Sequence, residues 1–456
     1  MKFAALPRRP QRRAAASLKA AALLLSFAAV SFNVGAQEEQ QKISGYNRER
    51  AMSMLGVVKS DLKKNYYDEK FRGIDLDARF KEAEGKIKAA TSLGQALGII
   101  AQTLVDFNDS HLYFVPPSRP SRVDYGWQMQ MIGDKCYVSA VRPGSDADKK
   151  GLRPGDEVWT IDGYGPGREN LWKMKYFYYS LRPRAGMVLV VRKPDSKEEQ
   201  HDVMAKVRQG KQVMDLSGSG SGGDIWQVLR EAEQEDRLDR HRFVEIGEEL
   251  FIWKMPQFDM GEAEVDDMMS KVRKRKALIL DLRGNGGGYV RMLERLVGHF
   301  IDRDLKIADL KGRKEMKPLM AKTHGDKVFK GQVFVLVDSE SGSAAELFAR
   351  IMQLEKRGLV IGDRTSGKVM QSRYHGHELG VDTVSFYGVS VTNADVIMAD
   401  GQSLENTGVA PDQLMLPTPA DMAAKRDPVL AHAAALAGIK LDPMKAGTLF
   451  PLEWRK

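Results

Sequence analysis

Val333-Phe334-Val335-Leu336-Val337 begins the most informative segment of the sequence, which continues as Asp338-Ser339-Glu340-Ser341-Gly342-Ser343-Ala344-Ala345-Glu346. Five consecutive apolar residues predict a strand that is buried on both faces, and helical spacing follows from Glu346 to Glu355. A serine at such a junction lies at the carboxyl edge of a sheet, beside the positive end of a helix dipole. Because Ser343-x-x-Glu346 also fits a capping box, the segment alone leaves two interpretations open, a nucleophile or a helix cap.

Similar strands flank this segment on both sides. Residues 250–255, 277–282 and 359–362 are short apolar runs, and helical spacing separates them. Apolar strands that alternate with helices predict a largely parallel sheet covered by helices. We therefore expect an α/β core over residues 225–418, followed by a C-terminal helical tail at 419–456.

The part of the chain that precedes the α/β core has a different pattern of apolar and polar residues. Residues 37–117 show helical spacing, whereas 122–208 contains short alternating strands at 135–141, 157–163 and 187–192. Residues 209–224 are a Gly/Ser linker by composition, and an acid-rich helix is expected at 232–239. The predicted fold class is thus multidomain α/β, with an N-terminal helical region, a β-rich domain and the α/β core.

The first 36 residues have the pattern of a secretory signal peptide. Six basic residues precede an apolar run at 20–30, and Val34-Gly35-Ala36 offers small residues for cleavage. The run is too short to span a bilayer, although an uncleaved anchor is the alternative. We expect a periplasmic or secreted protein after removal of the signal.

Charge and cysteine content exclude several classes. The net charge is +9, and removal of the six basic residues leaves +3, which gives no case for a nucleic-acid partner. Cys136 is the only cysteine, so no intrachain disulfide can form.

Two glycine-rich stretches have some features of nucleotide-binding loops. Gly362 to Lys368 has the spacing of a P-loop, but Val369 follows where a Ser or Thr is needed, and no helix is expected next. Residues 284–288 follow a strand but lack the glycine spacing of a dinucleotide site. We predict no nucleotide, and no metal or other cofactor.

A serine nucleophile needs a group that takes its proton. The eight histidines show no obvious spacing to Ser343, whereas Lys368 follows a strand and a glycine. A buried lysine can act as a base, because burial disfavours its charged form.

From about Asp109 to Asp412 the chain resembles the C-terminal, or tail-specific, processing proteases. The resemblance rests on several ordered motifs: Asp109-Ser110-His111, a PDZ-like module at 122–208 with Gly151-Leu152-x-Pro154-Gly155-Asp156-x-Val158, Leu280-Asp281-Leu282-Arg283-x-Asn285-x-Gly287-Gly288, Gly342-Ser343-Ala344-Ala345-Glu346, Gly367-Lys368 and Asn406-Thr407-Gly408-Val409-Ala410-Pro411-Asp412. The lysine lies 25 residues beyond the serine, as in the family.

The resemblance implies a role for each matching position. Ser343 is the nucleophile and Lys368 the general base. The amides of Ala344 and Gly287 form the oxyanion hole. Asp281 and Arg283 hold the glycine loop in shape.

One position departs from the family pattern. A glutamine usually stands four residues after the lysine, whereas Gln371 stands three residues after Lys368. Side chains alternate between the two faces of a regular strand, so a residue three positions after the lysine points to the face opposite to that of a residue four positions after it. Gln371 can therefore support the lysine only if a bulge or turn intervenes. Gln353, on the expected helix, is the other candidate.

The PDZ-like module implies protein or peptide substrates with accessible C-terminal tails. Its capture loop corresponds to Tyr125-Gly126-Trp127-Gln128, and a captured tail would add as a strand. Trp127 is bulky for this position.

Three hypotheses follow: an active serine–lysine endopeptidase, an inactive PDZ-containing scaffold that binds protein tails, and a small-molecule binder. The first is favoured, because a scaffold needs neither Ser343 nor Lys368. An adaptor protein, a homo-oligomer and the role of residues 209–240 are left open.

Overall fold

A computed structural model describes residues 43–117, 121–209, 240–380 and 385–454. The predicted signal peptide, the acid-rich helix and all but the first residue of the predicted linker lie outside the described residues. Among the described helices, none is long and apolar enough to cross a membrane.

A six-stranded sheet forms the centre of the core. Its order is β18 (Gln413–Leu414), β15 (Leu359–Gly362), β14 (Gln332–Val337), β11 (Ala277–Asp281), β10 (Leu250–Lys254) and β9 (Arg242–Ile246). Every neighbouring pair from β18 to β10 is parallel, and only the edge strand β9 runs antiparallel. The predicted largely parallel sheet is confirmed.

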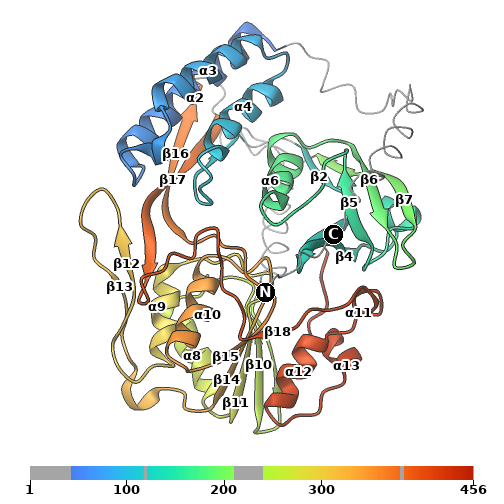
Figure 1. The fold of residues 1–456 in the computed structure, drawn as a ribbon, viewed down its shortest axis with the longest axis vertical. Helices are drawn as coiled ribbons and strands as arrows, with labels where there is room; N and C mark the ends of the chain where they lie inside the picture. Colours follow the sequence, from blue (N-terminus) through green and yellow to red (C-terminus); the bar gives the residue numbers. More distant parts are fainter. Residues whose placement is uncertain (1–42, 118–120, 210–239, 381–384, 455–456) are drawn as a thin grey trace, which may run out of the picture. The chain divides into compact units, whose positions relative to one another are not determined.

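Helices cover both faces of this sheet (Figure 1). One face packs against α8 (Glu262–Val272), α9 (Val290–Gly298) and α10 (Ala344–Leu354). The other packs against α12 (Pro428–Leu436) and α13 (Pro443–Leu449), which follow the short α11 (Pro419–Ala423). Successive strand residues such as Phe251 and Ile252 point to opposite layers, which explains why these strands are apolar throughout.

The N-terminal helices pack on a second sheet. They are α2 (Gly45–Asn65), α3 (Leu76–Ala89) and α4 (Leu93–Val105), with the short turn η1 (Phe71–Gly73). The sheet has the order β1 (Tyr113–Val115), β17 (Ser385–Met398), β12 (Leu305–Lys311) and β13 (Leu319–Ala321), and β16 (Met370–Leu379) pairs with β17. A turn, η3 (Gly325–Lys327), follows β13. Figure 1 shows β16 and β17 running from the core to the helical region.

The β-rich domain is an antiparallel sheet, as expected for a PDZ-like module. Its order is β3 (Trp127–Ile132), β4 (Lys135–Val141), β5 (Glu157–Ile161), β6 (Gly186–Arg192) and β7 (Glu198–Met204). β2 (Ser121–Asp124) pairs with β8 (Lys206–Gln209), so the segments by which the chain enters and leaves the domain lie side by side. The helices are α5 (Asp146–Lys149) and α6 (Leu171–Tyr176), which continues as η2 (Phe177–Leu181).

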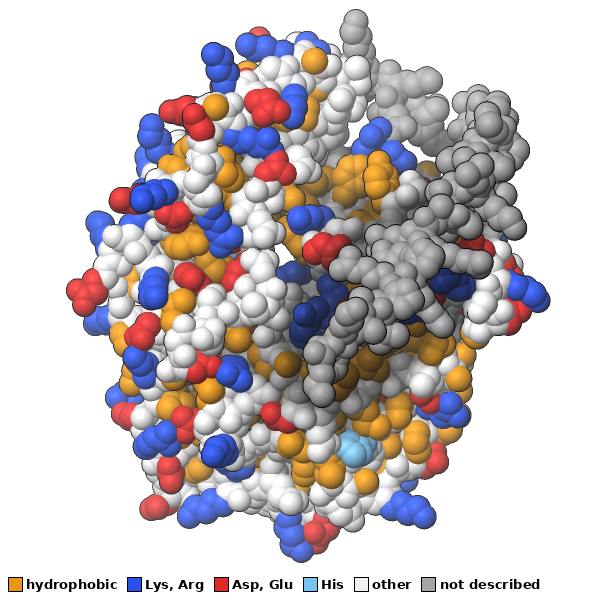
Figure 2. All heavy atoms as spheres, viewed as in Figure 1, with side chains coloured by type: hydrophobic (Ala, Val, Ile, Leu, Met, Phe, Trp, Pro, Cys, Tyr) orange, Lys and Arg blue, Asp and Glu red, His pale blue; other side chains and the backbone are white. Residues whose placement is uncertain are grey.

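The surface carries both kinds of charge. In Figure 2, acidic and basic side chains are interspersed over the outer part of the visible face, and basic side chains gather in a hollow near its centre. This mixture agrees with a net charge of only +9 from 70 basic and 61 acidic residues.

Candidate active site

Ser343 is the N-cap residue of α10, and it directly follows the loop that leaves β14. Its backbone has φ 53° and ψ −118°, a conformation that a non-glycine residue adopts only when its surroundings impose it. The Glu346 carboxylate accepts a hydrogen bond from the Ser343 N–H at 3.0 Å, and the Glu346 N–H donates to the Ser343 carbonyl at 2.9 Å. The Glu346 carboxylate and N–H therefore both bond to the backbone of Ser343 at the start of the helix, as in a capping box.

The buried Glu346 also binds the segment that carries the lysine. Its carboxylate accepts from Thr365 Oγ1 at 2.5 Å, from the Gly367 N–H at 2.7 Å and from the Lys368 N–H at 2.9 Å. The Ser343 N–H donates to the Lys368 carbonyl at 3.0 Å. Serine and lysine backbones are thus in direct contact, and the amides of the P-loop-like stretch are occupied by a carboxylate.

The surroundings of the Lys368 side chain destabilise its charged form. Burial lowers the pKa of Lys368, and the positive charge of Lys175 lowers this pKa further. The Nζ atom lies 5.4 Å from the ring centroid of Trp172. Burial and the charge of Lys175 both destabilise the charged amine, which is what a lysine that acts as a general base requires.

The glycine loop 284–288 approaches Ser343 from the other side. A Cβ at Gly287 would lie 2.6 Å from the Ser343 Cβ and 3.1 Å from the Ala344 nitrogen, and its φ is +109°. The Gly287 N–H donates to Asn285 Oδ1 at 2.8 Å. The two amides predicted to form the oxyanion hole therefore flank the serine, and the Gly287 amide would exchange Asn285 for the oxyanion.

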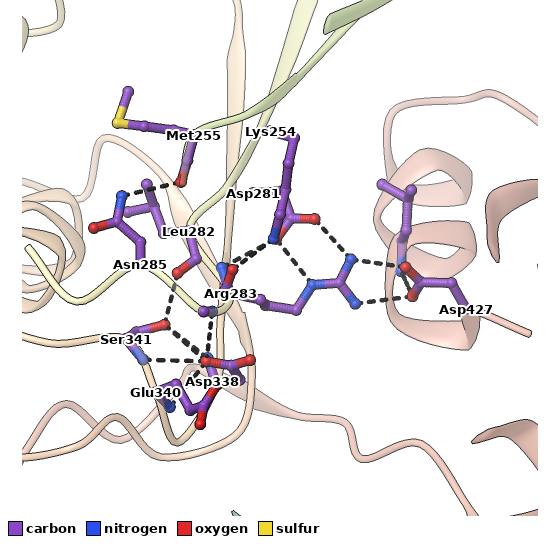
Figure 3. A network of polar contacts seen from close by, with 12 residues as sticks. Lys254, Met255, Asp281, Leu282, Arg283, Asn285, Asp338, Glu340, Ser341 and Asp427 are labelled. Atoms are coloured by element: carbon purple, nitrogen blue, oxygen red, sulfur yellow. Dashed lines mark hydrogen bonds and ion pairs between the residues drawn. The ribbon is translucent and has the colours of Figure 1, made fainter. Parts of the chain in front are cut away.

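Asp338 and Ser341 join the glycine loop to the serine loop (Figure 3). Asp338 Oδ1 accepts from the Gly284 N–H at 2.9 Å and from the Ser341 N–H at 3.1 Å. Ser341 Oγ donates to the Leu282 carbonyl at 2.8 Å. These bonds fix the distance between the nucleophile and the oxyanion loop.

Gln371 and Gln353 have different surroundings. Lys368 and Val369 precede β16 and are not part of a strand. The alternation of side chains in a strand therefore does not force Lys368 and Gln371 to point in opposite directions. Gln371 Oε1 is buried and has no hydrogen-bond partner among the described residues. Gln353 Nε2 instead donates to the Ala410 carbonyl and to Asp412, each at 2.9 Å. Of the two glutamines, Gln371 is thus the one with an unbonded buried acceptor, three residues along the chain from Lys368.

A proton relay that the sequence interpretation missed lies beside Lys368. Ser110 Oγ donates to Glu405 Oε2 at 2.8 Å and lies 2.8 Å from His111 Nδ1. Because the serine proton goes to the carboxylate, Nδ1 must donate to Oγ, and Nε2 then carries the free lone pair. Glu405 also accepts from the Val369 N–H at 2.9 Å, which ties the relay to the lysine segment.

The relay histidine is neutral at physiological pH. Burial lowers the pKa of His111 to about 4, and the positive charge of Lys368 contributes to this shift. Asp109-Ser110-His111 was visible as a motif, but Glu405 lies 295 residues from Ser110, so no local pattern connects them. Asp109 itself is buried and accepts from Tyr66 and Thr392.

The predicted capture loop is only partly available to a ligand. Tyr125 and Trp127 are 1% and 3% exposed and belong to the hydrophobic core of the PDZ-like domain. The Gly126 N–H donates to Asp124 Oδ1 at 3.0 Å. The side chains of Tyr125 and Trp127 therefore face the core, so capture of a tail at this loop would depend on backbone N–H groups, and the assignment of the loop to substrate binding stays a prediction. Gln128 is exposed, and β3 is an edge strand.

The PDZ-like domain contacts the serine loop. Gln130 Nε2 donates to Asp338 Oδ2 at 2.6 Å, and Ser339 Oγ donates to the Met131 carbonyl at 2.6 Å. Lys175 forms an ion pair with Glu340. The domain thus lies directly against the loop that carries the nucleophile.

One group of side chains has the composition of a metal site. Asp266, His299 and His324 bring their ligand atoms within 4.8 Å of one another. The two imidazole rings, however, are stacked at 3.7 Å with an interplanar angle of 2°. Lone pairs in parallel planes do not converge on one cation, so we assign no metal to this group.

The comparisons with known proteins agree with this geometry. Residues 252–415 match the model of peptidase family S41. The tail-specific protease of Haemophilus influenzae is 26% identical over 296 residues, which are 63% of this chain and 39% of that protein. A probable CtpA-like serine protease of Staphylococcus aureus is 23% identical over 382 residues, 82% of this chain and 66% of that protein. The chain thus spans about two fifths of the length of the first relative.

Solved structures show the same fold. The crystal structure of mature CPAF aligns with a TM-score of 0.61 at 16% identity, and covers 83% of this chain and 95% of that chain. The matched family region contains the serine, the lysine, both oxyanion amides and Glu405, whereas Ser110 and His111 lie outside it.

Proposed function

Because residues 252–415 match the model of peptidase family S41, we propose that the chain is an exported serine endopeptidase that forms an acyl-enzyme on Ser343. One observation carries the proposal: a strained serine at a helix N-terminus has a buried lysine segment on one side and a glycine amide on the other. The basic and apolar N-terminal sequence supports export.

The reaction follows from these positions. Neutral Lys368 accepts the Ser343 hydroxyl proton while Oγ bonds to the scissile carbonyl carbon. The carbonyl oxygen becomes an oxyanion that receives hydrogen bonds from the Ala344 and Gly287 amides. When the C–N bond breaks, Lys368 returns the proton to the leaving amine. Water then attacks the acyl-enzyme, Lys368 takes its proton, and the serine leaves with that proton.

The relay supplies a second group that could accept the serine proton. His111 is neutral, its Nε2 is free to accept, and the Ser110–Glu405 pair would stabilise the imidazolium that forms. The influence of Lys368 on the pKa of His111 indicates that the two groups are close. We assign the base to Lys368, and single variants at the two positions separate the alternatives.

The substrates that this site fits are polypeptides, and we propose that the PDZ-like domain engages their C-terminal tails. Its edge strand β3 offers backbone groups to an added strand, and Gln128 is the exposed side chain of the capture loop. The contacts from Gln130 and Lys175 to the serine loop support communication between tail binding and catalysis.

Two observations favour the second candidate, an inactive scaffold that binds tails. The Gly287 N–H is occupied by Asn285, and Trp172 of the PDZ-like domain lies over Lys368. In the active-enzyme proposal the same features describe a resting state that substrate binding releases.

Cleavage of unstructured casein by the protein without residues 1–36 tests the proposal. We expect the wild type to cut, and Ser343→Ala and Lys368→Ala to be inactive at unchanged folding. If Lys368→Ala retains activity and His111→Ala does not, the histidine is the base. If Ser343→Ala cuts as well as the wild type, the nucleophile is wrong. If every form is inactive while a tail peptide still binds, the scaffold is correct.

A further inference from the structure

The guanidinium of Arg283 is held between two carboxylates (Figure 3). Its Nε and one terminal nitrogen donate to Asp281 at 2.9 and 2.7 Å. Both terminal nitrogens donate to Asp427 at 2.9 and 2.7 Å. Two bidentate pairs on one guanidinium leave its orientation little freedom.

The two carboxylates belong to different layers of the core. Asp281 ends β11, immediately before the glycine loop. Asp427 is the N-cap residue of α12, in the C-terminal layer on the other face of the sheet. Asp427 lies 144 residues from Arg283 and outside the region that matches the family model. The contact therefore links the loop at the active site to a part of the chain to which no catalytic role has been assigned.

The glycine loop depends on anchors at its start. Four of its five residues (284–288) are glycines, which lose more conformational freedom on folding than other residues. The Arg283 carbonyl accepts from Lys254 Nζ at 2.5 Å, and the Arg283 N–H donates to Asp281 at 3.1 Å. Arg283 thus sets the position from which the chain runs to Gly287.

Asp427 supplies the second negative charge that the two cations at this position, Lys254 and Arg283, require. Lys254 and Arg283 both contact Asp281, so without Asp427 two cations would share one buried carboxylate. A buried charge that loses its partner is costly, and the side chain moves to recover solvent. Movement of Arg283 would displace the loop that follows it.

We propose that Asp427 is a positioning residue for the oxyanion hole, acting through Arg283 on the loop that presents the Gly287 amide. Its second task, capping α12, is separate: Asp427 Oδ1 accepts from the Leu430 N–H at 2.9 Å. The catalytic consequence rests on the proposed peptidase function, whereas the control of loop geometry does not.

Asp427→Asn separates the two tasks. Asparagine caps helices as well as aspartate, but it loses the charge and one of the two acceptors for the guanidinium. Asp442→Asn is the matched control, because Asp442 caps the neighbouring helix α13 with no ion pair among the described residues. Asp427→Glu keeps the carboxylate. Arg283→Gln, alone and combined with Asp427→Asn, completes a double-mutant cycle.

The kinetic measurement is kcat and KM for a short unstructured peptide. We expect Asp427→Asn to lower kcat by about 10- to 100-fold with KM changed less than about twofold, because loss of a whole oxyanion donor costs about 100- to 1,000-fold. Asp427→Glu should recover part of the loss, and Asp442→Asn should behave as the wild type. The double variant should be no slower than Arg283→Gln. If kcat is unchanged in Asp427→Asn, or if Asp442→Asn loses as much, the inference is overturned.

Hydrogen–deuterium exchange decides the same question without catalysis. The amides of Gly284 and Gly287 are hydrogen-bonded, so a loosened loop exchanges faster. We expect faster exchange over residues 283–288 in Asp427→Asn and unchanged exchange in the interior of α12. Unchanged exchange in the loop overturns the inference even if the protein cleaves. If the wild type cleaves no substrate but the loop responds, the positioning role stands and the peptidase proposal fails.

Discussion

At the residue scale, the site consists of a strained serine and the groups that force it into place. The Ser343 N–H donates to the Glu346 carboxylate and to the Lys368 carbonyl, and these bonds hold the residue at its positive φ. Glycine at 287 permits the close approach of the neighbouring loop. The position of one side chain therefore depends on backbone groups from three segments.

Gly287→Ala tests the steric part of this description. A methyl group at Gly287 would lie 2.6 Å from the Ser343 Cβ, and the positive φ disfavours alanine as well. We expect at least a hundredfold loss of kcat. Gly286→Ala is the control, because a Cβ there meets no atom within 4 Å and needs no unusual backbone conformation. Equal losses in both variants would show that the loop tolerates no side chain, and the specific contact would not be supported.

The pH dependence of kcat/KM tests Lys368 as the base. Burial lowers the pKa of this lysine below its ordinary 10.5, so the neutral, active form appears at lower pH than for an exposed lysine. Activity should rise with pH through a limb that lies below 10.5 and should be lost as the lysine becomes protonated. A rate that stays flat through neutral pH and rises only near pH 10 would contradict the shift.

At the scale of elements, strand ends and helix starts bring the chemistry together. β11 ends at the glycine loop, β14 ends at the serine loop, and α10 begins directly after Ser343, its N-cap residue. Parallel strands place their carboxyl ends at one edge, which explains why both loops meet there. The C-terminal helices complete the second layer over the same sheet.

The contact between α8 and α9 predicts acid sensitivity. His299, at the end of α9, bonds to Asp266 of α8 at 2.8 Å, stacks on His324 and contacts Arg273, while Arg295 pairs with the same Asp266. Burial lowers the pKa of His299 to about 4 from 6.5. Between these values the unfolded chain binds the proton and the folded chain does not, so stability falls as the pH decreases from 6.5 to 4.

The expected contribution is a decrease in unfolding free energy of up to about 1.4 kcal/mol per pH unit for this one group. Chemical denaturation at several pH values measures it. His299→Gln should flatten the slope over this range, and its stability relative to the wild type should improve as the pH falls. A slope that is the same in both proteins would remove His299 as the cause.

At the scale of the whole molecule, the PDZ-like domain influences Lys368, the proposed base, directly. Lys175 of α6 pairs with Glu340 of the serine loop, and its charge lowers the pKa of Lys368. Gln130 and Ser339 add two further bonds between the domain and that loop. Docking of the domain therefore affects the protonation of the base.

Lys175→Gln makes this coupling measurable. Removal of the positive charge raises the pKa of Lys368, so the acid limb of kcat/KM should move to higher pH while the plateau is retained. Lys173→Gln, on the same helix, is the control and should leave the limb in place. If both variants shift the limb equally, or neither does, the coupling between α6 and the lysine is absent.

The sequence by itself predicted the elements and singled out the two residues on which the proposed mechanism depends. The apolar runs at 277–282, 333–337 and 359–362 predicted strands that the structure confirms, because local periodicity reports which faces are buried. The family motifs, rather than the periodicity, singled out Ser343 and Lys368. These are local patterns, and a chain carries them before it folds.

Only the tertiary structure decided which distant groups meet. Glu405 lies 295 residues from Ser110, and Asp427 lies 144 residues from Arg283, so no spacing along the chain predicts either pair. The burial of Trp127 was also undecided, because alternation in β3 does not say which face meets the core. Long-range pairing depends on how layers pack, and packing is a property of the folded molecule rather than of any segment.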